Sequence, residues 1–139
     1  MNLAEKIHEL NLGTGNILRG IASQMNLTLP QVQCFLTIPF ESINMTNLSH
    51  QLGIDNSTLT RNLAKLEGRG FIEKNHDGYD KRVIHISLTQ NGKQTLSEIE
   101  SRLEDISHKI LTSLAFEDRQ VVFEALEKLS WSLEKINYK

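Results

Sequence analysis

The side chains best suited to chemistry form a polar cluster between positions 57 and 66, where leucines interrupt them. Leu59, Leu63 and Leu66 recur at helical spacing and predict one buried face. The groups left on the other faces are hydroxyls, an amide and cations, carried by Ser57, Thr58, Thr60, Arg61, Asn62 and Lys65. A helix that reads the major groove of DNA needs such groups, because hydroxyls reach phosphates or bases, arginine pairs with guanine edges and lysine neutralises phosphate. An ordinary solvated helix face is the alternative interpretation.

A second polar cluster, Asp80, Lys81 and Arg82, lies in a predicted hairpin turn. An arginine at a hairpin tip can enter the minor groove of DNA, where narrow stretches enhance the negative potential. A free Asp80 would repel phosphate, so we expect its carboxylate to pair with Arg82 and fix the orientation of the guanidinium. A polar turn of no functional significance is the alternative.

Two short helices separated by a glycine are predicted to carry the first cluster. Thr46 predicts the N-cap of the first helix, and Gly53 ends it. Asp55 or Asn56 is expected to cap the second helix, which runs to Gly68–Gly70. This arrangement is typical of a helix-turn-helix unit.

A β-hairpin is predicted directly after this unit. Residues 43–45, before it, read as a short extended link. Strands are expected over 71–76 and 83–89, because the second of these runs approaches period two. Asp77-Gly78 is a turn signal between the strands. A hairpin in this position would be the wing of a winged helix-turn-helix.

Amphipathic helices are predicted at both ends of the chain. An apolar stripe runs through 2–24, where Gly13, Gly15 and Gly20 indicate a bend or a close packing contact. Pro30 suits the first turn of the following helix, and Pro39 should end or kink that helix.

Two further amphipathic helices are predicted in the C-terminal third, over 91–114 and again after a break at 116–118. A chain of this size has little core to cover so many apolar stripes. We therefore expect residues 1–25 and 95–139 to pack against a second copy.

The expected fold class is mainly α with a small β-hairpin wing, a winged helix-turn-helix embedded in an α-helical dimer. We divide the chain into an N-terminal dimerisation helix (1–28), a winged helix-turn-helix region (29–90) and C-terminal dimerisation helices (91–139), within one compact domain overall.

Composition bounds the class of protein. The chain has 139 residues, 39% of them hydrophobic, and a formal net charge of −2. Residues 45–90 hold six Lys/Arg against five Asp/Glu, and residues 91–139 hold seven against nine, so the middle is slightly basic and the C-terminal third acidic. No apolar run is long enough to span a bilayer and no leader is evident, so we expect a cytoplasmic protein without a membrane partner.

Cys34 is the single cysteine, which excludes an intramolecular disulfide and a cysteine-rich zinc module. It is a candidate redox-sensing thiol, with a buried structural thiol as the favoured alternative, since no cation lies within six residues of it. We expect no metal and no cofactor. Four apolar side chains are candidates for a ligand cleft, with core packing as the alternative: Ile17, Ile21, Phe35 and Phe40.

The segment Leu48–Leu63, with its continuation Leu66–Ile72, resembles the helix-turn-helix of the MarR family of bacterial transcriptional regulators. The run Asp80–Arg82, followed by Ile86–Thr89 and Gly92, resembles the wing and exit of that family. The resemblance implies a winged helix within an α-helical homodimer that binds pseudo-palindromic promoter DNA, often released by a small ligand or by thiol oxidation. By position, it implies helix contacts from Ser57, Thr58, Thr60 and Arg61, and a wing pair of Asp80 and Arg82.

No nucleophile-elbow, P-loop, dinucleotide-binding or HExxH pattern is present, so an enzyme is not expected. The leading hypothesis is a repressor of promoter DNA that responds to a small effector or another signal. The alternative is a winged-helix protein-interaction module that does not bind DNA. Such a module has no need for positive charge on both the helix and the wing.

Overall fold

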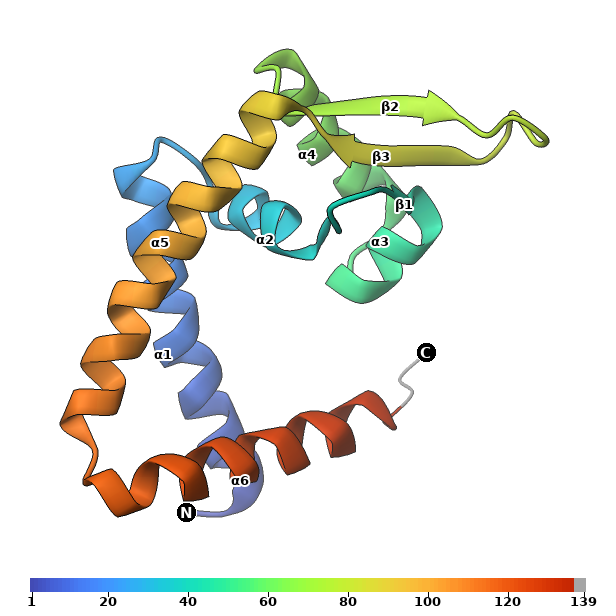
Figure 1. Ribbon diagram of the computed structural model, residues 1–139. Helices are drawn as coiled ribbons and strands as arrows, with labels where there is room; N and C mark the ends of the chain where they lie inside the picture. Colours follow the sequence, from blue (N-terminus) through green and yellow to red (C-terminus); the bar gives the residue numbers. More distant parts are fainter. Residues whose placement is uncertain (137–139) are drawn as a thin grey trace. The chain divides into compact units, whose positions relative to one another are not determined.

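The computed structural model describes residues 1–136, which form six helices and three strands (Figure 1). The helices are α1 (Leu3–Gln24), α2 (Leu29–Thr37), α3 (Met45–Leu52), α4 (Asn56–Gly68), α5 (Gln90–Ser113) and α6 (Phe116–Glu134). The strands are β1 (Ile43–Asn44), β2 (Ile72–His76) and β3 (Ile84–Leu88). The chain divides into two compact units, one ending at Glu100 and the other beginning at Ser101. The expected fold class, mainly α with a small β wing, is confirmed.

The helix-turn-helix lies where the sequence predicted it, with one correction. Asn44, not Thr46, is the N-cap of α3, and its side-chain oxygen accepts a hydrogen bond from the Asn47 amide at 2.8 Å. The helix begins earlier because Asn44 is the last residue of β1 and its extended backbone suits a cap. Gly53 ends α3 in the left-handed region, with φ of 68°. Asp55 caps α4, one of the two predicted candidates.

α1 is one continuous helix through all three of its glycines, and a Cβ at Gly13 or Gly20 would meet nothing within 4 Å, so these two glycines mark no close packing contact. Glycine lowers helix propensity by only about 1 kcal/mol, and the capping box between Asn2 and Glu5 stabilises the first turn. α2 starts after Thr28 with Pro30 in its first turn. It ends at Thr37, two residues before Pro39, as predicted.

The sheet is antiparallel, with strand order β1-β3-β2. β2 and β3 form the predicted hairpin, with Asn75 opposite His85 and Lys74 opposite Ile86. The link at 43–45 was predicted to be extended, and its first two residues pair with His85 and Ile86 as a third strand. The sheet therefore joins the hairpin to the start of α3.

The core of the first unit lies where α2, α3 and α4 meet one face of the sheet. Phe35 is fully buried and makes an edge-to-face contact with Phe71, at 5.4 Å between ring centroids. The three leucines that define the inner face of α4 are all fully buried, together with Leu48 and Ile86. This packing fixes which side of α4 faces outward.

Gly92 lies where the hairpin passes into α5. A Cβ at this position would lie 2.0 Å from the carbonyl oxygen of Phe71. That oxygen accepts a hydrogen bond from the Thr89 amide, and the Thr89 hydroxyl bonds both the Gly70 carbonyl and the Gly92 amide. The junction has no room for any side chain at position 92.

The second unit contains the end of α5 and all of α6. The break between them falls at Leu114 and Ala115, so the break predicted at 116–118 is wrong: Phe116 is already the first residue of α6. Ala115 caps α6 without a side-chain hydrogen bond, which left no cap signal in the sequence. No residue of α6 within the described range is buried. Over residues 1–136, no helix is both long and apolar enough to cross a membrane.

Candidate nucleic-acid interface

α4 presents the predicted polar cluster on its outer faces because its leucine face is committed to the core. Ser57, Thr60, Arg61 and Lys65 are exposed, and Thr58 and Asn62 are half-buried. All six residues therefore lie on one element whose rotation about its own axis is fixed by buried leucines. A helix held in this way can offer hydroxyl and cationic groups to a groove without losing its register.

The first turn of α4 is organised by a hydrogen-bonded chain of three side chains. The Asp55 carboxylate accepts a bond from the Thr58 amide at 2.7 Å and one from the Thr58 hydroxyl at 3.0 Å. The backbone bond from Thr58 is the main reason that the pKa of Asp55 lies below its usual value. Arg61 Nη2 donates to the Thr58 hydroxyl at 3.3 Å. Asp55 thus caps the helix and, through Thr58, orients an exposed guanidinium.

The remaining cluster residues differ in how far they are constrained. The Thr60 hydroxyl donates to the Asn56 carbonyl within α4, at 2.7 Å, which leaves its oxygen able to accept a bond. Among the described residues, Lys65 forms no ion pair within 4.0 Å. Lys65 therefore has its charge available to a phosphate group.

Asp80 and Arg82 form a bidentate ion pair at the hairpin loop. Arg82 Nε lies 3.1 Å from Asp80 Oδ1, and Nη2 lies 3.0 Å from Oδ2. The bond from the Arg82 side chain holds the pKa of Asp80 below its usual value, and the same contact raises the pKa of Arg82. The Arg82 side chain is nevertheless 90% exposed. The pair therefore orients the guanidinium while leaving it accessible.

The sequence interpretation missed a second acidic residue that organises the loop. Asp77 Oδ2 accepts hydrogen bonds from the amides of Tyr79 and Asp80, both at 3.0 Å. Asp77 Oδ1 lies 2.9 Å from His85 Nε2 in β3. The Asp-Gly dipeptide signalled a turn, but the contact with His85 depends on strand register, which the sequence did not specify.

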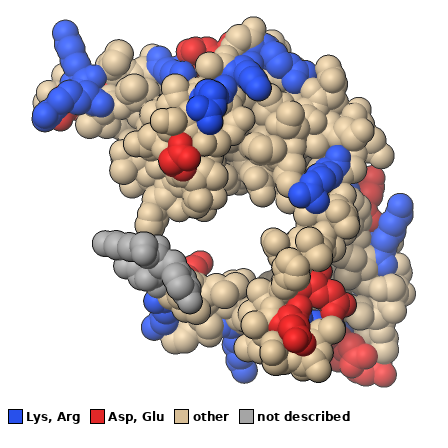
Figure 2. Space-filling view, turned by 180° about the vertical axis from the view of Figure 1, so that it is seen from behind, with Lys and Arg blue, Asp and Glu red and all other residues tan. Residues whose placement is uncertain are grey.

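Other cations near the cluster are occupied in structural contacts. Arg69 donates to the carbonyl of Asn26 at 2.8 Å and its guanidinium covers the ring of Phe71. Lys74 of β2 lies 3.8 Å from Glu67 of α4. The exposed cations of α4 and the hairpin loop that lie outside these contacts are Arg61, Lys65, Lys81 and Arg82. Figure 2 shows Lys and Arg side chains at the hairpin tip and over the adjoining surface.

Cys34 is fully buried, and burial raises the pKa of its thiol to about 11. Such a thiol is a poor nucleophile, so the structure favours a structural role over a redox sensor. Of the candidate cleft residues, Phe35 and Ile21 are in the core, whereas Phe40 is exposed. No group of three or more His, Cys, Asp or Glu within residues 1–136 has the geometry to hold a metal ion.

A comparison with protein families matches residues 27–84 to the MarR family. The matched segment contains α2, β1, α3, α4, β2 and the hairpin loop, and therefore both polar clusters. Over this segment, the chain is similar to the MarR family.

Curated proteins that this chain resembles are regulators by name. It is 25% identical over 112 residues to the uncharacterized HTH-type transcriptional regulator YfiV of Bacillus subtilis, covering 80% of this chain and 70% of YfiV. It is 28% identical over 95 residues to the transcriptional repressor MprA of Escherichia coli, covering 68% of this chain and 54% of MprA. The chain thus spans about half to 70% of the length of these relatives.

Solved structures extend the likeness beyond the matched segment. Apo MarR from E. coli is 23% identical, with a TM-score of 0.83 over 93% of this chain and 96% of that one. A mutant E. coli MarR complexed with operator DNA has a TM-score of 0.75 over 91% of this chain and 92% of that one, also at 23% identity. The fold of nearly the whole chain is therefore the MarR fold.

Proposed function

We propose that this protein is a DNA-binding transcriptional regulator that places α4 in the major groove and the hairpin loop in the adjacent minor groove. The observation that carries the proposal is the pair of oriented, exposed guanidinium groups. Arg61 is held by Thr58 on α4, and Arg82 is held by Asp80 on the hairpin. Arginines that are prepositioned in this way lose less side-chain freedom on binding than free ones.

The charge distribution supports DNA over a protein partner. Exposed cations lie on two separate elements, α4 and the wing, although the net charge of the chain is −2. A DNA duplex has phosphates on both sides of each groove, so cations on α4 and on the wing could both contact phosphate groups. The family of the matched segment and the printed names of the relatives agree with this proposal.

The test is an electrophoretic shift with DNA from upstream of the chain's own coding region, against scrambled DNA of the same length. The proposal expects a specific complex. Arg61→Ala should weaken the specific complex by roughly 1–3 kcal/mol and bring its affinity closer to that for scrambled DNA, if Arg61 reads a base. Equal losses on both DNAs would make Arg61 a phosphate contact, and no shift with any DNA would favour the protein-interaction module.

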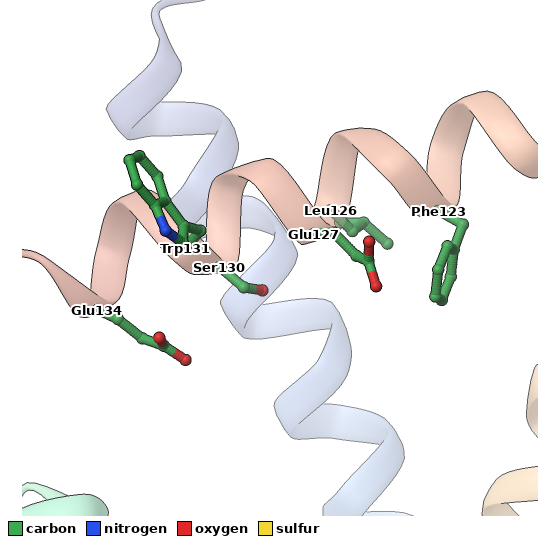
Figure 3. A pocket seen from close by; sticks show the side chains of 6 residues that line it. All are labelled: Phe123, Leu126, Glu127, Ser130, Trp131 and Glu134. Carbon is green, nitrogen blue, oxygen red and sulfur yellow. The ribbon is translucent and has the colours of Figure 1, made fainter.

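The proposed assembly is a homodimer. Large apolar side chains of α6 are exposed in the single chain, with Phe123 at 57% and Trp131 at 60%. Phe123, Leu126 and Trp131 line one shallow groove with Glu127, Ser130 and Glu134 (Figure 3). Apolar surface of this extent on a small protein is typical of an interface. A second copy of the chain would bury it and pair two winged helices for a pseudo-palindromic site.

Sedimentation of the parent chain and two variants tests the homodimer. Phe123→Glu places a charge on the apolar face of α6 and should shift the parent's dimer toward monomer. Tyr79→Glu changes a fully exposed aromatic residue in the hairpin loop and should leave the dimer intact. A parent chain that sediments as a stable monomer at micromolar concentration would refute this part of the proposal.

Repression, with release by a small effector, completes the proposal. An open groove of about 490 Å³ lies beside Phe40, with Leu36 and Leu96 on its walls. The Lys93 ammonium lies 4.2 Å from the centroid of the Phe40 ring. A compound that lowers the DNA affinity of the parent through this groove should lose its effect in Phe40→Ala.

A further inference from the structure

The base of the hairpin loop holds a side-chain pair that joins the end of β2 to β3. Asp77 Oδ1 and His85 Nε2 are 2.9 Å apart, and both side chains are about one-third exposed, at 30% and 33%. A carboxylate can only accept hydrogen bonds, so His85 Nε2 carries the hydrogen in this contact. The cross-strand partners of His85 are Asn44 and Asn75, which bear no charge.

The second oxygen of Asp77 fixes the backbone of the loop. Oδ2 accepts bonds from the amides of Tyr79 and Asp80. Asp80 then accepts a bond from the Arg82 amide at 3.0 Å, in addition to its two contacts with the guanidinium. Hydrogen bonds therefore connect His85, Asp77, Asp80 and Arg82 in one continuous chain.

We propose that Asp77 and His85 are positioning residues for DNA binding: His85 anchors Asp77 to β3, Asp77 fixes the loop, and the fixed loop lets Asp80 present Arg82. The inference rests on the proposed function. It adds two residues to the interface that would act on affinity without themselves contacting DNA.

The first test is a titration of upstream DNA with three variants. His85→Leu removes the donor and should weaken binding roughly two- to tenfold, the range expected for one hydrogen bond that positions a contact. His85→Gln places an amide N–H near the position of Nε2 and should restore most of the affinity. Asp77→Ala makes the protein more positive by one charge, so general electrostatics predicts tighter binding. If Asp77 positions the loop, the same variant should bind DNA more weakly. The electrostatic and positioning explanations therefore predict opposite changes in DNA affinity.

A double-mutant cycle separates positioning from a general structural role. In an Arg82→Ala background, His85→Leu should cost nothing further, because the group that His85 positions is gone. The matched control is Ser87→Ala, two residues along β3, which should leave affinity unchanged in both backgrounds. A His85→Leu loss that is equally large in the Arg82→Ala background would overturn the proposal. Tighter binding by Asp77→Ala would also overturn it.

Amide hydrogen exchange of the free protein makes failure of this proposal distinguishable from failure of the proposed function. In His85→Leu the amides of Tyr79 and Asp80 should exchange roughly two- to tenfold faster than in the parent, because their acceptor is no longer anchored. If the parent binds DNA and the amides of His85→Leu exchange as slowly as those of the parent, only the positioning role is refuted. If the parent binds no DNA but the amides of His85→Leu exchange faster than those of the parent, the proposed function is refuted. The role of His85 and Asp77 in fixing the loop would then still hold.

Discussion

Adding one methyl group at Gly92 should destabilise the whole first unit. In Gly92→Ala the new Cβ would meet the Phe71 carbonyl oxygen at 2.0 Å, whereas such contacts essentially never fall below 3.0 Å. The start of α5 and the end of the turn before β2 must therefore separate by about 1 Å, the difference between the two distances. A closely packed interior does not absorb such a shift locally.

The magnitude follows from the bonds that the shift stretches. Three hydrogen bonds meet there, from Thr89 N to Phe71 O, from the Thr89 hydroxyl to Gly70 O and from Gly92 N to the Thr89 hydroxyl. Losing two or three of them at about 1 kcal/mol each gives roughly 2–3 kcal/mol. Alanine recovers about 0.5–1 kcal/mol of helix propensity. We therefore expect the free energy of unfolding to fall by roughly 1–3 kcal/mol.

Urea unfolding followed by circular dichroism measures this change. All variants are compared at one protein concentration, because the stability of the proposed homodimer would depend on concentration. Gly68→Ala is the matched control: it lies in the last turn of α4, with nothing within 4 Å of its Cβ. This variant should be as stable as the parent or slightly more so. A Gly92→Ala protein that unfolds at the parent's urea concentration would refute the argument from close approach.

Three further predictions follow from the same geometry. Arg82→Ala should weaken binding to upstream DNA, and Asp80→Ala should weaken it too despite the more positive charge; tighter binding by a folded Asp80→Ala would show that Asp80 does not orient Arg82. Because the pKa of Asp80 is depressed, the ion pair should persist as pH falls through the usual aspartate range and be lost only below it; a carboxyl resonance of Asp80 that titrates at the ordinary value would contradict this. The Cys34 thiol, with its pKa near 11, should react with a thiol reagent at pH 8 far more slowly in the native than in the urea-unfolded chain, and equal rates would contradict its burial.

The sequence predicted those elements whose signals are local. The leucine spacing located α4, Gly53 located the end of α3, and the prolines at 30 and 39 bounded α2, because each signal acts within one or two turns. The cap at Asn44 was missed because it depends on pairing with β3, far along the chain. Ala115 has no capping side chain, so nothing local marked the true start of α6.

The sequence also predicted those parts of the candidate site that depend on local spacing. The outward residues of α4 follow from periodicity, and a contact between Asp80 and Arg82 was expected from their two-residue spacing near a turn. The roles of Asp77 and His85 were not foreseen, because their contact requires the register of the hairpin. The structural use of Arg69 was also missed, since its partner Asn26 lies 43 residues away. Contacts that cross elements lie beyond what spacing alone predicts.

The salt dependence of DNA affinity tests the central claim most directly, because it counts the phosphates that the protein neutralises. The double variant Lys65→Gln, Lys81→Gln removes one exposed cation from α4 and one from the wing. Its matched control, Lys109→Gln, Lys128→Gln, makes the same change of charge in the second unit. The slope of log affinity against log salt should become shallower by roughly 1–2 for each protomer in the first variant and stay unchanged in the control. Equal slopes in both variants and the parent would contradict an interface formed by α4 and the wing.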